Sequence, residues 1–351
     1  MPSGFLLYGS TGFLGDAIAR LSVKKGMAPI LAARNTERLK AQATELGLDY
    51  RAFPLEDSRT IDAALADVVA VLNCAGPYIH TFRPMVASCL RLGKHYLDIS
   101  GEIPVYEGIA SRDAEAKAKG AMLMPGVGFD VVPTDCLAVH LKQRLPSATR
   151  LTLAFQSRGP AGLPPGTQRT MIELIPYGNR VRRHGQLVIP KQSLKTRHID
   201  FGQGPVQATR LTWGDVFMAY HSTGIPDIED YAVFPESVRQ QMALFDTLRP
   251  LFKLRTVRNL LKRGVKPGST PEQRARTTTH VWGEVEDDQG RIAESRLHGP
   301  EAGVVWTSRA ALAAVEKVLA GGVPPGFQTP ARAFGADFVL ECEGVTREDV
   351  S

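Results

Sequence analysis

The sequence contains no long apolar run and few cysteines. No stretch of eighteen consecutive apolar residues occurs in the 351-residue chain, and its start lacks a basic stretch followed by an apolar one. The sequence therefore predicts neither a membrane span nor a secretory signal, and the cytoplasm is the expected location. The four cysteines (Cys74, Cys89, Cys136 and Cys342) show no C-x-x-C spacing and no histidine pattern, which argues against disulfides and zinc.

The length of the chain indicates how many domains it forms, and its charge bears on the partners that it could bind. With 351 residues, of which 43% are hydrophobic, the chain is too long for one ordinary core, and two domains are expected. Residues 1–135 carry 14 basic and 15 acidic residues, so the net charge of +6 arises in the remainder. This excess fits an acidic substrate, an anionic surface or solubility alone. No metal-ligand cluster, nucleophilic triad or nucleic-acid motif stands out, so neither a metal nor a nucleic acid is expected.

A glycine-rich turn stands near the start of the chain. An apolar strand expected at residues 5–8 leads into Gly9, Gly12 and Gly15, and a helical pattern follows. The first glycine permits a tight turn, the second lets the backbone approach a pyrophosphate, and the third lets the helix pack closely on the strand. The helix N-terminus would then bind the phosphates of a dinucleotide. The expected cofactor contacts are Gly9, Ser10, Thr11, Gly12, Phe13, Leu14 and Gly15.

Basic residues follow the second expected strand, at residues 28–33. Arg34 and Asn35 come directly after it, and Arg38 lies one helical turn further on. An NAD-specific site places a carboxylate here for the ribose hydroxyls, whereas arginines suit a 2′-phosphate. NADP(H) is therefore the expected cofactor, with Arg34, Asn35 and Arg38 as contacts. The alternative is a solvated arginine at a helix start.

Four more strands are expected at residues 49–54, 68–72, 95–98 and 121–124, with helices between them. Together they predict an α/β fold whose first domain, residues 1–145, is a Rossmann-type parallel sheet. Ligands bind at the carboxyl ends of such strands, so the loops there should surround the nicotinamide. The further cofactor candidates are Asp57, Asn73, Cys74, Ala75, Gly76 and Pro77. The candidate proton donors are Tyr78, His80, Asp98, Glu102 and Asp130, although each of these side chains could instead tie a loop by hydrogen bonds.

From residue 151 onward the pattern changes to alternating strands, the last two of which face each other across a turn at residues 287–290. This predicts a second, α+β domain at residues 146–325, built on an antiparallel sheet, with a tail at residues 326–351 that packs back on the first domain. Thr167 is a suitable N-cap for a helix, and Arg169 would lie in its first turn. Thr167, Arg169 and Thr170 are the candidate substrate contacts. Arg158, Arg180, Arg182 and Arg183 are further available cations.

A basic segment spans residues 249–266, with seven basic residues and no acidic one. A helix here would place Leu254, Val257 and Leu261 on one face, with Lys253 and Arg255 turned broadly away. Such a helix could lie on an anionic membrane surface or hold a lipid-linked substrate. The alternative is a surface helix packed on its domain.

Six short segments resemble the saccharopine dehydrogenase-like oxidoreductases, which include saccharopine reductase and trans-acting enoyl reductases. They are GSTGFLG (9–15), ARN (33–35), LNCAGPY (72–78), HYLDISGE (95–102), PGVGFD (125–130) and, more faintly, GFQTP (326–330). The resemblance covers the first 145 residues closely and the second domain in outline. It implies NADP(H) use and two domains with a cleft between them, and it leaves the substrate open.

The absence of one catalytic residue pair limits the reactions that the protein is expected to catalyse. No tyrosine has a lysine four residues later, as a tyrosine-catalysed carbonyl reductase requires. An NADPH-dependent oxidoreductase that delivers hydride to a C=C or C=N bond of an anionic or lipid-linked small molecule is therefore expected. The alternative is a nucleotide-binding protein without turnover that acts as a membrane-associated or regulatory partner. Association into a homodimer is left open.

Overall fold

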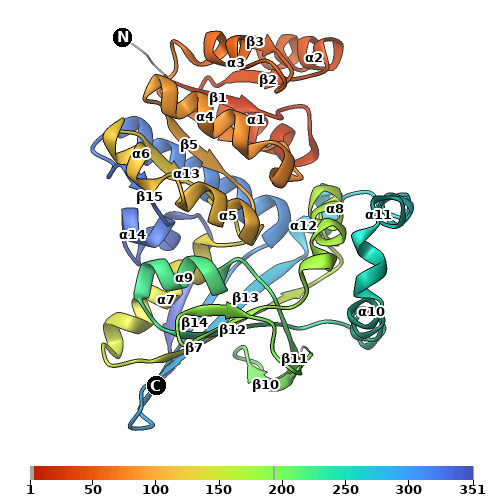
Figure 1. Ribbon diagram of the computed structural model, residues 1–351, viewed down its shortest axis with the longest axis vertical. Helices are drawn as coiled ribbons and strands as arrows, with labels where there is room; N and C mark the ends of the chain where they lie inside the picture. The colour runs from red at the N-terminus through yellow and green to blue at the C-terminus, as the bar shows by residue number, and fades with distance from the viewer. Residues whose placement is uncertain (1–3, 193, 351) are drawn as a thin grey trace.

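Two β-sheets, one above the other in Figure 1, organise the chain. The computed structural model describes residues 4–192 and 194–350, so residues 1–3 of the predicted first domain and residue 351 of the predicted tail lie outside the described residues. The described strands of the first sheet are all parallel, in the order β15-β6-β5-β4-β1-β2-β3. They are β1 (Phe5–Tyr8), β2 (Ile30–Ala33), β3 (Tyr50–Ala52), β4 (Ala70–Asn73), β5 (His95–Asp98), β6 (Met122–Met124) and β15 (Gly326–Phe327).

Helices connect these strands, as the sequence predicts. They are α1 (Phe13–Lys24), α2 (Thr36–Leu46), α3 (Ser58–Leu65), α4 (Phe82–Leu92), α5 (Ile103–Ala110), α6 (Asp113–Ala118) and α7 (Val132–Arg144). The connection between β5 and β6 contains two helices, α5 and α6.

Late parts of the chain complete the first sheet. Helix α13 (Thr307–Ala320), which follows the π-helical turn η4 (Ala302–Trp306), packs beside α1 and against β4 and β5. Strand β15 then pairs with β6, with Gly326 opposite Met122. The remaining tail contains α14 (Pro330–Phe334), which packs on α7, followed by η5 (Phe338–Glu341) and β16 (Thr346–Asp349). Because β16 pairs with the second sheet, the tail contacts both sheets.

The second sheet is mixed, in the order β10-β11-β12-β7-β13-β14-β16. Its further strands are β7 (Arg150–Arg158), β10 (Thr196–Asp200), β11 (Pro205–Leu211), β12 (Asp227–Ala232), β13 (Thr278–Glu286) and β14 (Ile292–Pro300), with the small hairpin β8 (Val181–Arg183) and β9 (Gln186–Val188) beside β12. The predicted hairpin joins β13 to β14. The pairing is antiparallel as expected, except that β7 and β12 run parallel.

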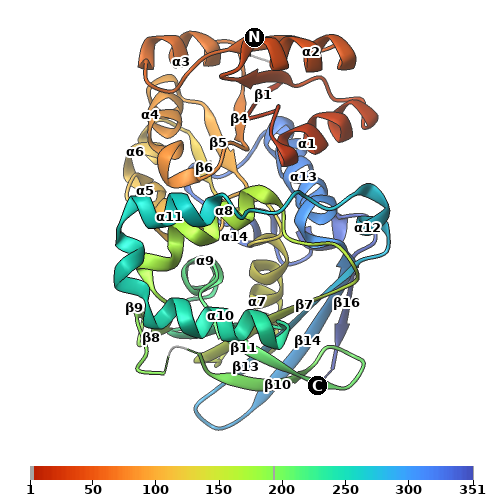
Figure 2. The ribbon, with the colours of Figure 1, turned by 90° about the vertical axis from the view of Figure 1, so that its right-hand side faces the viewer.

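Helices of the second half lie around this sheet. They are α8 (Pro165–Leu174) with the 3₁₀ turn η2 (Ile175–Tyr177), α9 (Asp215–Thr223), α10 (Glu236–Thr247), η3 (Arg249–Lys253), α11 (Arg255–Lys262) and α12 (Pro271–Ala275). Figure 2 shows α10 and α11 as an outer layer that faces the viewer. Helices α10 and α11 are separated by η3, which contains Pro250, so the basic segment at residues 249–266 is not one continuous helix. Among the helices of the described ranges, none is long and apolar enough to cross a bilayer.

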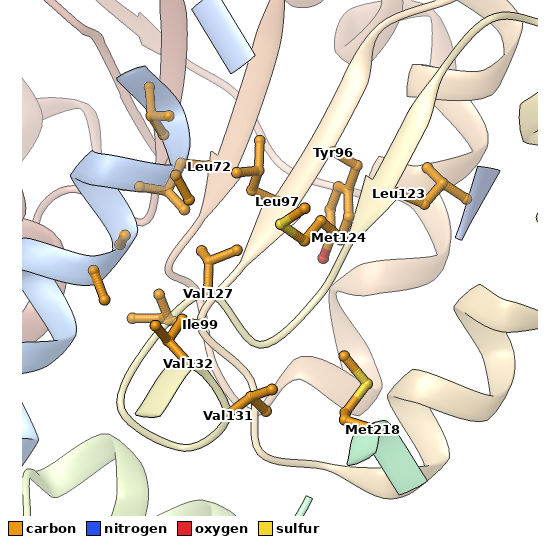
Figure 3. Close-up of a cluster of buried hydrophobic side chains, with 14 of the residues drawn as sticks. Leu72, Tyr96, Leu97, Ile99, Leu123, Met124, Val127, Val131, Val132 and Met218 are labelled. Atoms are coloured by element: carbon orange, nitrogen blue, oxygen red, sulfur yellow. The ribbon is translucent and has the colours of Figure 1, made fainter. Parts of the chain in front are cut away.

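One hydrophobic core extends from the first sheet into the second half. Figure 3 shows Leu72 of β4, Leu97 of β5 and Met124 of β6 packed together, with Val132 of α7 below them. Met218 of α9 joins the same cluster. From the second half, the shared core includes residues of α9 and α13, and α13 packs on β4 and β5 of the first sheet.

Candidate functional site

A cavity of about 970 Å³ runs along the carboxyl edge of the first sheet. At one end it is lined by the glycine turn and the loop after β2. At its centre it is lined by the loops after β4 and β5, and at the other end by α8, η2 and α10. The two ends come from opposite halves of the chain, so a ligand in the cavity would contact both.

The glycine turn leaves its backbone open to a ligand. Gly9 has a φ of +83°, and a β-carbon there would stand 2.8 Å from the backbone nitrogen of Ala75. A β-carbon on Gly15 would stand 2.1 Å from the carbonyl oxygen of Gly9. The N-cap residue of α1 is Gly12. Because glycine has no side chain, the first N–H groups of the helix receive no side-chain cap. These residues therefore fit a dinucleotide pyrophosphate, which would accept hydrogen bonds from the free N–H groups.

Two arginines border the same end of the cavity. Arg34 follows β2 directly, Arg38 lies in the first turn of α2, and both are exposed side chains in the cavity wall. Asn35 also lines the wall, but its Oδ1 atom accepts a hydrogen bond of 2.9 Å from the backbone N–H of Arg38 and so caps α2. No acidic residue stands at this end among the described lining residues. The arrangement fits a 2′-phosphate better than free ribose hydroxyls.

Several predicted cofactor contacts lie behind the cavity wall. Thr11, Phe13, Leu14, Cys74, Ala75 and Gly76 line the cavity, whereas Ser10, Gly15, Asp57, Asn73 and Pro77 are not among its lining residues. Asp57 caps α3 by accepting a 3.1 Å hydrogen bond from the N–H of Arg59. Asn73 accepts a 3.0 Å bond from the N–H of Ala75 and donates to Tyr96. Asp57 and Asn73 thus have clear structural roles.

Two of the predicted proton donors also tie loops. Asp98 is fully buried and accepts hydrogen bonds from the N–H groups of Ser100 (2.9 Å) and Gly126 (3.0 Å). Glu102 accepts from the N–H groups of Tyr78 (2.7 Å) and Ile79 (2.9 Å). Burial raises the pKa of Glu102 to about 7. Neither carboxylate belongs to the cavity wall.

Glu102 also connects the two halves of the site. The hydroxyl of Thr170, on α8, donates to its Oε1 atom at 3.4 Å. The same carboxylate therefore holds the loop after β4 and the helix that lines the far end of the cavity.

Of the three remaining predicted proton donors, Tyr78 and Asp130 line the cavity. Asp130 is half-buried, and its carboxylate has no hydrogen bond or ion pair with the residues that the structure describes. Burial raises the pKa of Asp130 to about 7, so the acid is partly protonated at neutral pH. Burial, followed by nearby Cys74 and carboxylates that include Asp130, raises the pKa of Tyr78 well above its usual value. The Tyr78 phenol therefore stays neutral. His80 is not in the wall.

The predicted substrate contacts Thr167, Arg169 and Thr170 all line the far end. The helix that carries them begins at Pro165 with Pro164 as its N-cap, so the prediction that Thr167 is the N-cap is wrong. A proline at the first helical position loses no hydrogen bond and sets the required φ, which explains the earlier start. Arg169 consequently lies in the second turn, exposed and without an ion pair among the described residues.

Most of the far wall was not predicted from the sequence. Most of its additional residues are apolar or aromatic: Met171, Ile172, Leu174, Ile175, Tyr177, Leu211, Trp213, Val238, Met242 and Phe245. The polar ones are Asn179, Thr212, Gln241 and Asp246. They come from three separate segments of the chain, and no sequence motif joins these segments. Arg180 also lines the wall, whereas Arg182 donates to the carbonyl oxygen of Val216 at 2.7 Å and Arg183 pairs with Glu229.

Comparison with known proteins agrees with this geometry. The family model "Saccharopine dehydrogenase NADP binding domain" matches residues 5–124. Residues 5–124 are therefore similar to a saccharopine dehydrogenase NADP-binding domain. The match contains the glycine turn, Arg34, Arg38 and the loops after β4 and β5.

Curated relatives of this NADP-binding domain are named trans-acting enoyl reductase. One from Mycobacterium leprae is 34% identical over 148 residues, which are 40% of this chain and 35% of the relative. Another from Mycobacterium tuberculosis is 32% identical over 147 residues, with the same coverage. The alignment thus spans about a third of the length of these relatives.

The solved structure of apo saccharopine dehydrogenase (L-Glu forming) from Saccharomyces cerevisiae matches over 99% of this chain and 100% of its own. The TM-score is 0.68 and the sequence identity 13%. The shared fold therefore extends beyond the saccharopine dehydrogenase NADP-binding domain to the second sheet.

Proposed function

We propose that this protein is an NADPH-dependent reductase that saturates a C=C bond conjugated to a carbonyl group in a largely apolar substrate. The observation that supports this most is the continuity of one cavity. It leads from the phosphate-binding turn, past Tyr78 and Asp130, to the apolar wall of α8 and α10. A cofactor and a hydride acceptor could occupy its two ends together, as hydride transfer requires.

The chain's own groups would perform distinct tasks. The backbone of the glycine turn and the side chains of Arg34 and Arg38 bind and orient NADPH, which supplies the hydride when bound. Hydride addition to the β-carbon of an unsaturated carbonyl compound leaves negative charge on the α-carbon and the carbonyl oxygen. Neutral Asp130 would donate its proton to the α-carbon, and the Tyr78 hydroxyl would donate a hydrogen bond to the oxygen. One hydride and one proton then saturate the double bond.

The composition of the far wall supports a C=C acceptor over a C=N bond flanked by carboxylates. A substrate with several carboxylates needs several cations in the site. Arg169 and Arg180 are the cationic side chains of the far wall among the described lining residues, and Arg180 already lies 3.9 Å from Glu107. The two arginines suit one anionic group at the end of an apolar body.

The test is NADPH oxidation by the purified chain with short- and long-chain 2-enoyl thioesters, beside imines of a keto acid and an amine. Oxidation with long-chain enoyl thioesters, lost in Asp130→Asn while NADPH binding by calorimetry is unchanged, is the expected result. NADPH oxidation with the imines but not with the enoyl thioesters would mean that the protein reduces a C=N bond and not a C=C bond. Tight NADPH binding without turnover of any acceptor would favour the nucleotide-binding protein without turnover.

A further inference from the structure

The outer surface of α10, η3 and α11 carries an unusual group of exposed leucines. Leu244, Leu248 and Leu251 follow one another at spacings of four and three residues, with 54%, 38% and 51% of their surface exposed. Leu254 and Leu260 are 57% and 64% exposed. Five of the seven leucines that are exposed on the described surface therefore lie within seventeen residues. Scattered exposed leucines are ordinary, but such a cluster indicates an interaction surface.

Of these five leucines, Leu254 alone belongs to the apolar face that the amphipathic pattern of the sequence predicts. Val257 and Leu261 of the predicted apolar face are half-buried, because that side of α11 packs against α8. The other exposed leucines are Leu244 of α10, Leu248 at its end, Leu251 of η3 and Leu260 of α11. The packed-helix alternative is thus correct for one face of α11 and leaves the other face open.

Basic side chains stand among the exposed leucines. Arg258 and Lys262 are satisfied by Glu173 of α8, with Arg258 Nε 2.8 Å from its Oε2 atom. Lys253, Arg255, Arg263 and Lys266 are exposed, and the described residues offer none of them an ion pair. We name the five exposed leucines and these four cations the leucine–basic surface.

The leucine–basic surface lies back to back with the cavity. The opposite side of α10 supplies Val238, Met242 and Phe245 to the apolar wall. Figure 2 shows α10 and α11 across the face that the viewer sees, outside α8. Helix α10, which bears the exposed Leu244, is therefore also a wall of the cavity.

We propose that the leucine–basic surface docks on an anionic lipid bilayer, with the leucines in the interface and the four cations on acidic headgroups. An interfacial segment combines these two features: apolar side chains enter the headgroup–acyl boundary while neighbouring cations contact anionic lipids. Charge complementarity favours the bilayer over a second copy of the chain, since two copies of this surface would place like charges together. Docking would bring the apolar chamber next to the bilayer.

The experiment is co-sedimentation of the full chain with vesicles of phosphatidylcholine alone or mixed with phosphatidylserine. Binding should require phosphatidylserine and weaken as salt is raised. Lys253→Glu with Arg255→Glu should weaken partitioning by at least about tenfold, since each cation near an anionic surface contributes about a fivefold factor. Leu251→Ser with Leu260→Ser should weaken it comparably and leave the salt dependence in place.

Matched controls come from elsewhere on the surface. Ile292→Ser removes an apolar side chain that is 52% exposed in β14, and Lys40→Glu with Lys119→Glu reverses two exposed lysines of the first half. Both controls should bind vesicles as the unchanged chain does. No binding to phosphatidylserine vesicles, or equal losses in the controls, would overturn the proposal. A concentration-dependent dimer that is lost in Leu251→Ser with Leu260→Ser, without vesicle binding, would replace the bilayer by a second copy.

The vesicle experiment and the reductase assay test two independent proposals, and either proposal can be wrong while the other is correct. The substituted residues do not line the cavity, so turnover of a soluble short-chain acceptor should be unchanged in every surface variant. Vesicle binding needs neither cofactor nor acceptor.

Discussion

The Oδ2 atom of Asp130 lies 2.6 Å from the point at which a β-carbon on Gly101 would stand. The absence of a side chain at residue 101 therefore gives the unpaired acid its position in the cavity. An ordinary β-carbon contact is well above 3 Å, so any larger residue here must displace the carboxyl group. This relationship yields the first prediction.

Gly101→Ala should lower the rate of the hydride step by about tenfold to a hundredfold, because a shift of about 1 Å in a proton donor has that effect. Stability should change little, since the displaced group is the end of a side chain that can rotate. Single-turnover kinetics and thermal unfolding measure the two effects. Equal rates in Gly101→Ala and the unchanged chain would contradict the role of Asp130.

The second prediction concerns pH. The pKa of Asp130 is about 7, raised from its usual 3.8 by burial, and the neutral acid is the proposed donor. The rate of the hydride step should therefore be constant well below pH 7 and fall about tenfold per pH unit above it. In the Asp130→Asn variant the hydride step should be slow, and its rate should not show this fall above pH 7.

Glu102 provides the control for the pH profile, because burial raises its pKa to about 7 as well. Glu102→Gln should keep the fall above pH 7, since its carboxylate ties loops outside the cavity wall. If the fall in rate above pH 7 were lost in Glu102→Gln and kept in Asp130→Asn, Glu102 would be the proton donor and Asp130 would not.

The third prediction concerns the cofactor. Arg34→Ala should weaken NADPH binding by roughly ten- to a hundredfold and leave NADH binding nearly unchanged, because a charge-assisted contact with the 2′-phosphate is worth about 1.5–3 kcal/mol. Calorimetric titration with both cofactors measures the difference. Lys40→Ala, in the same helix α2 but outside the cavity wall, is the matched control. Equal affinity of the unchanged chain for NADPH and NADH would refute the assignment.

The fourth prediction concerns Arg169. Arg169→Ala should raise KM for an acceptor with an anionic group by about tenfold and leave NADPH affinity unchanged, since the side chain lines the far end of the cavity. An acceptor without that group should show no change. A loss of NADPH affinity would instead place Arg169 on the cofactor.

The parallel sheet and its cofactor end could be predicted from the sequence because their signals are local. The glycine spacing, the strand before it and the arginines after β2 each depend on neighbouring residues. The cavity wall also contains Tyr78 and Asp130, which loops at strand ends bring to one edge. Sequence could not distinguish these two from Asp98 and Glu102, whose hydrogen-bond partners are set by tertiary contacts.

The second half was harder because long-range contacts decide its elements. Strand β12 reads as a polar loop, with Asp227, Glu229 and Asp230 in six residues, yet it is a central strand. Glu229 is stabilised there by Arg183 and Arg210 from β8 and β11. The sequence likewise does not show which cations of the basic segment are paired, because the acid that pairs with Arg258 is Glu173, 85 residues earlier.

The position of β15 and α13 constrains how the nascent chain acquires its fold. When residues 5–124 leave the ribosome, the outer edge of β6 has no partner strand and α1 lacks its neighbour α13. The missing elements, α13 and β15, are synthesised only after residue 306. Contacts of such long sequence separation form late and slow folding. Until about residue 327 is synthesised, the growing chain exposes an open strand edge and an apolar face, which are the features that chaperones recognise. The cofactor-binding part is thus translated before the second half but is completed only after the second half has been made.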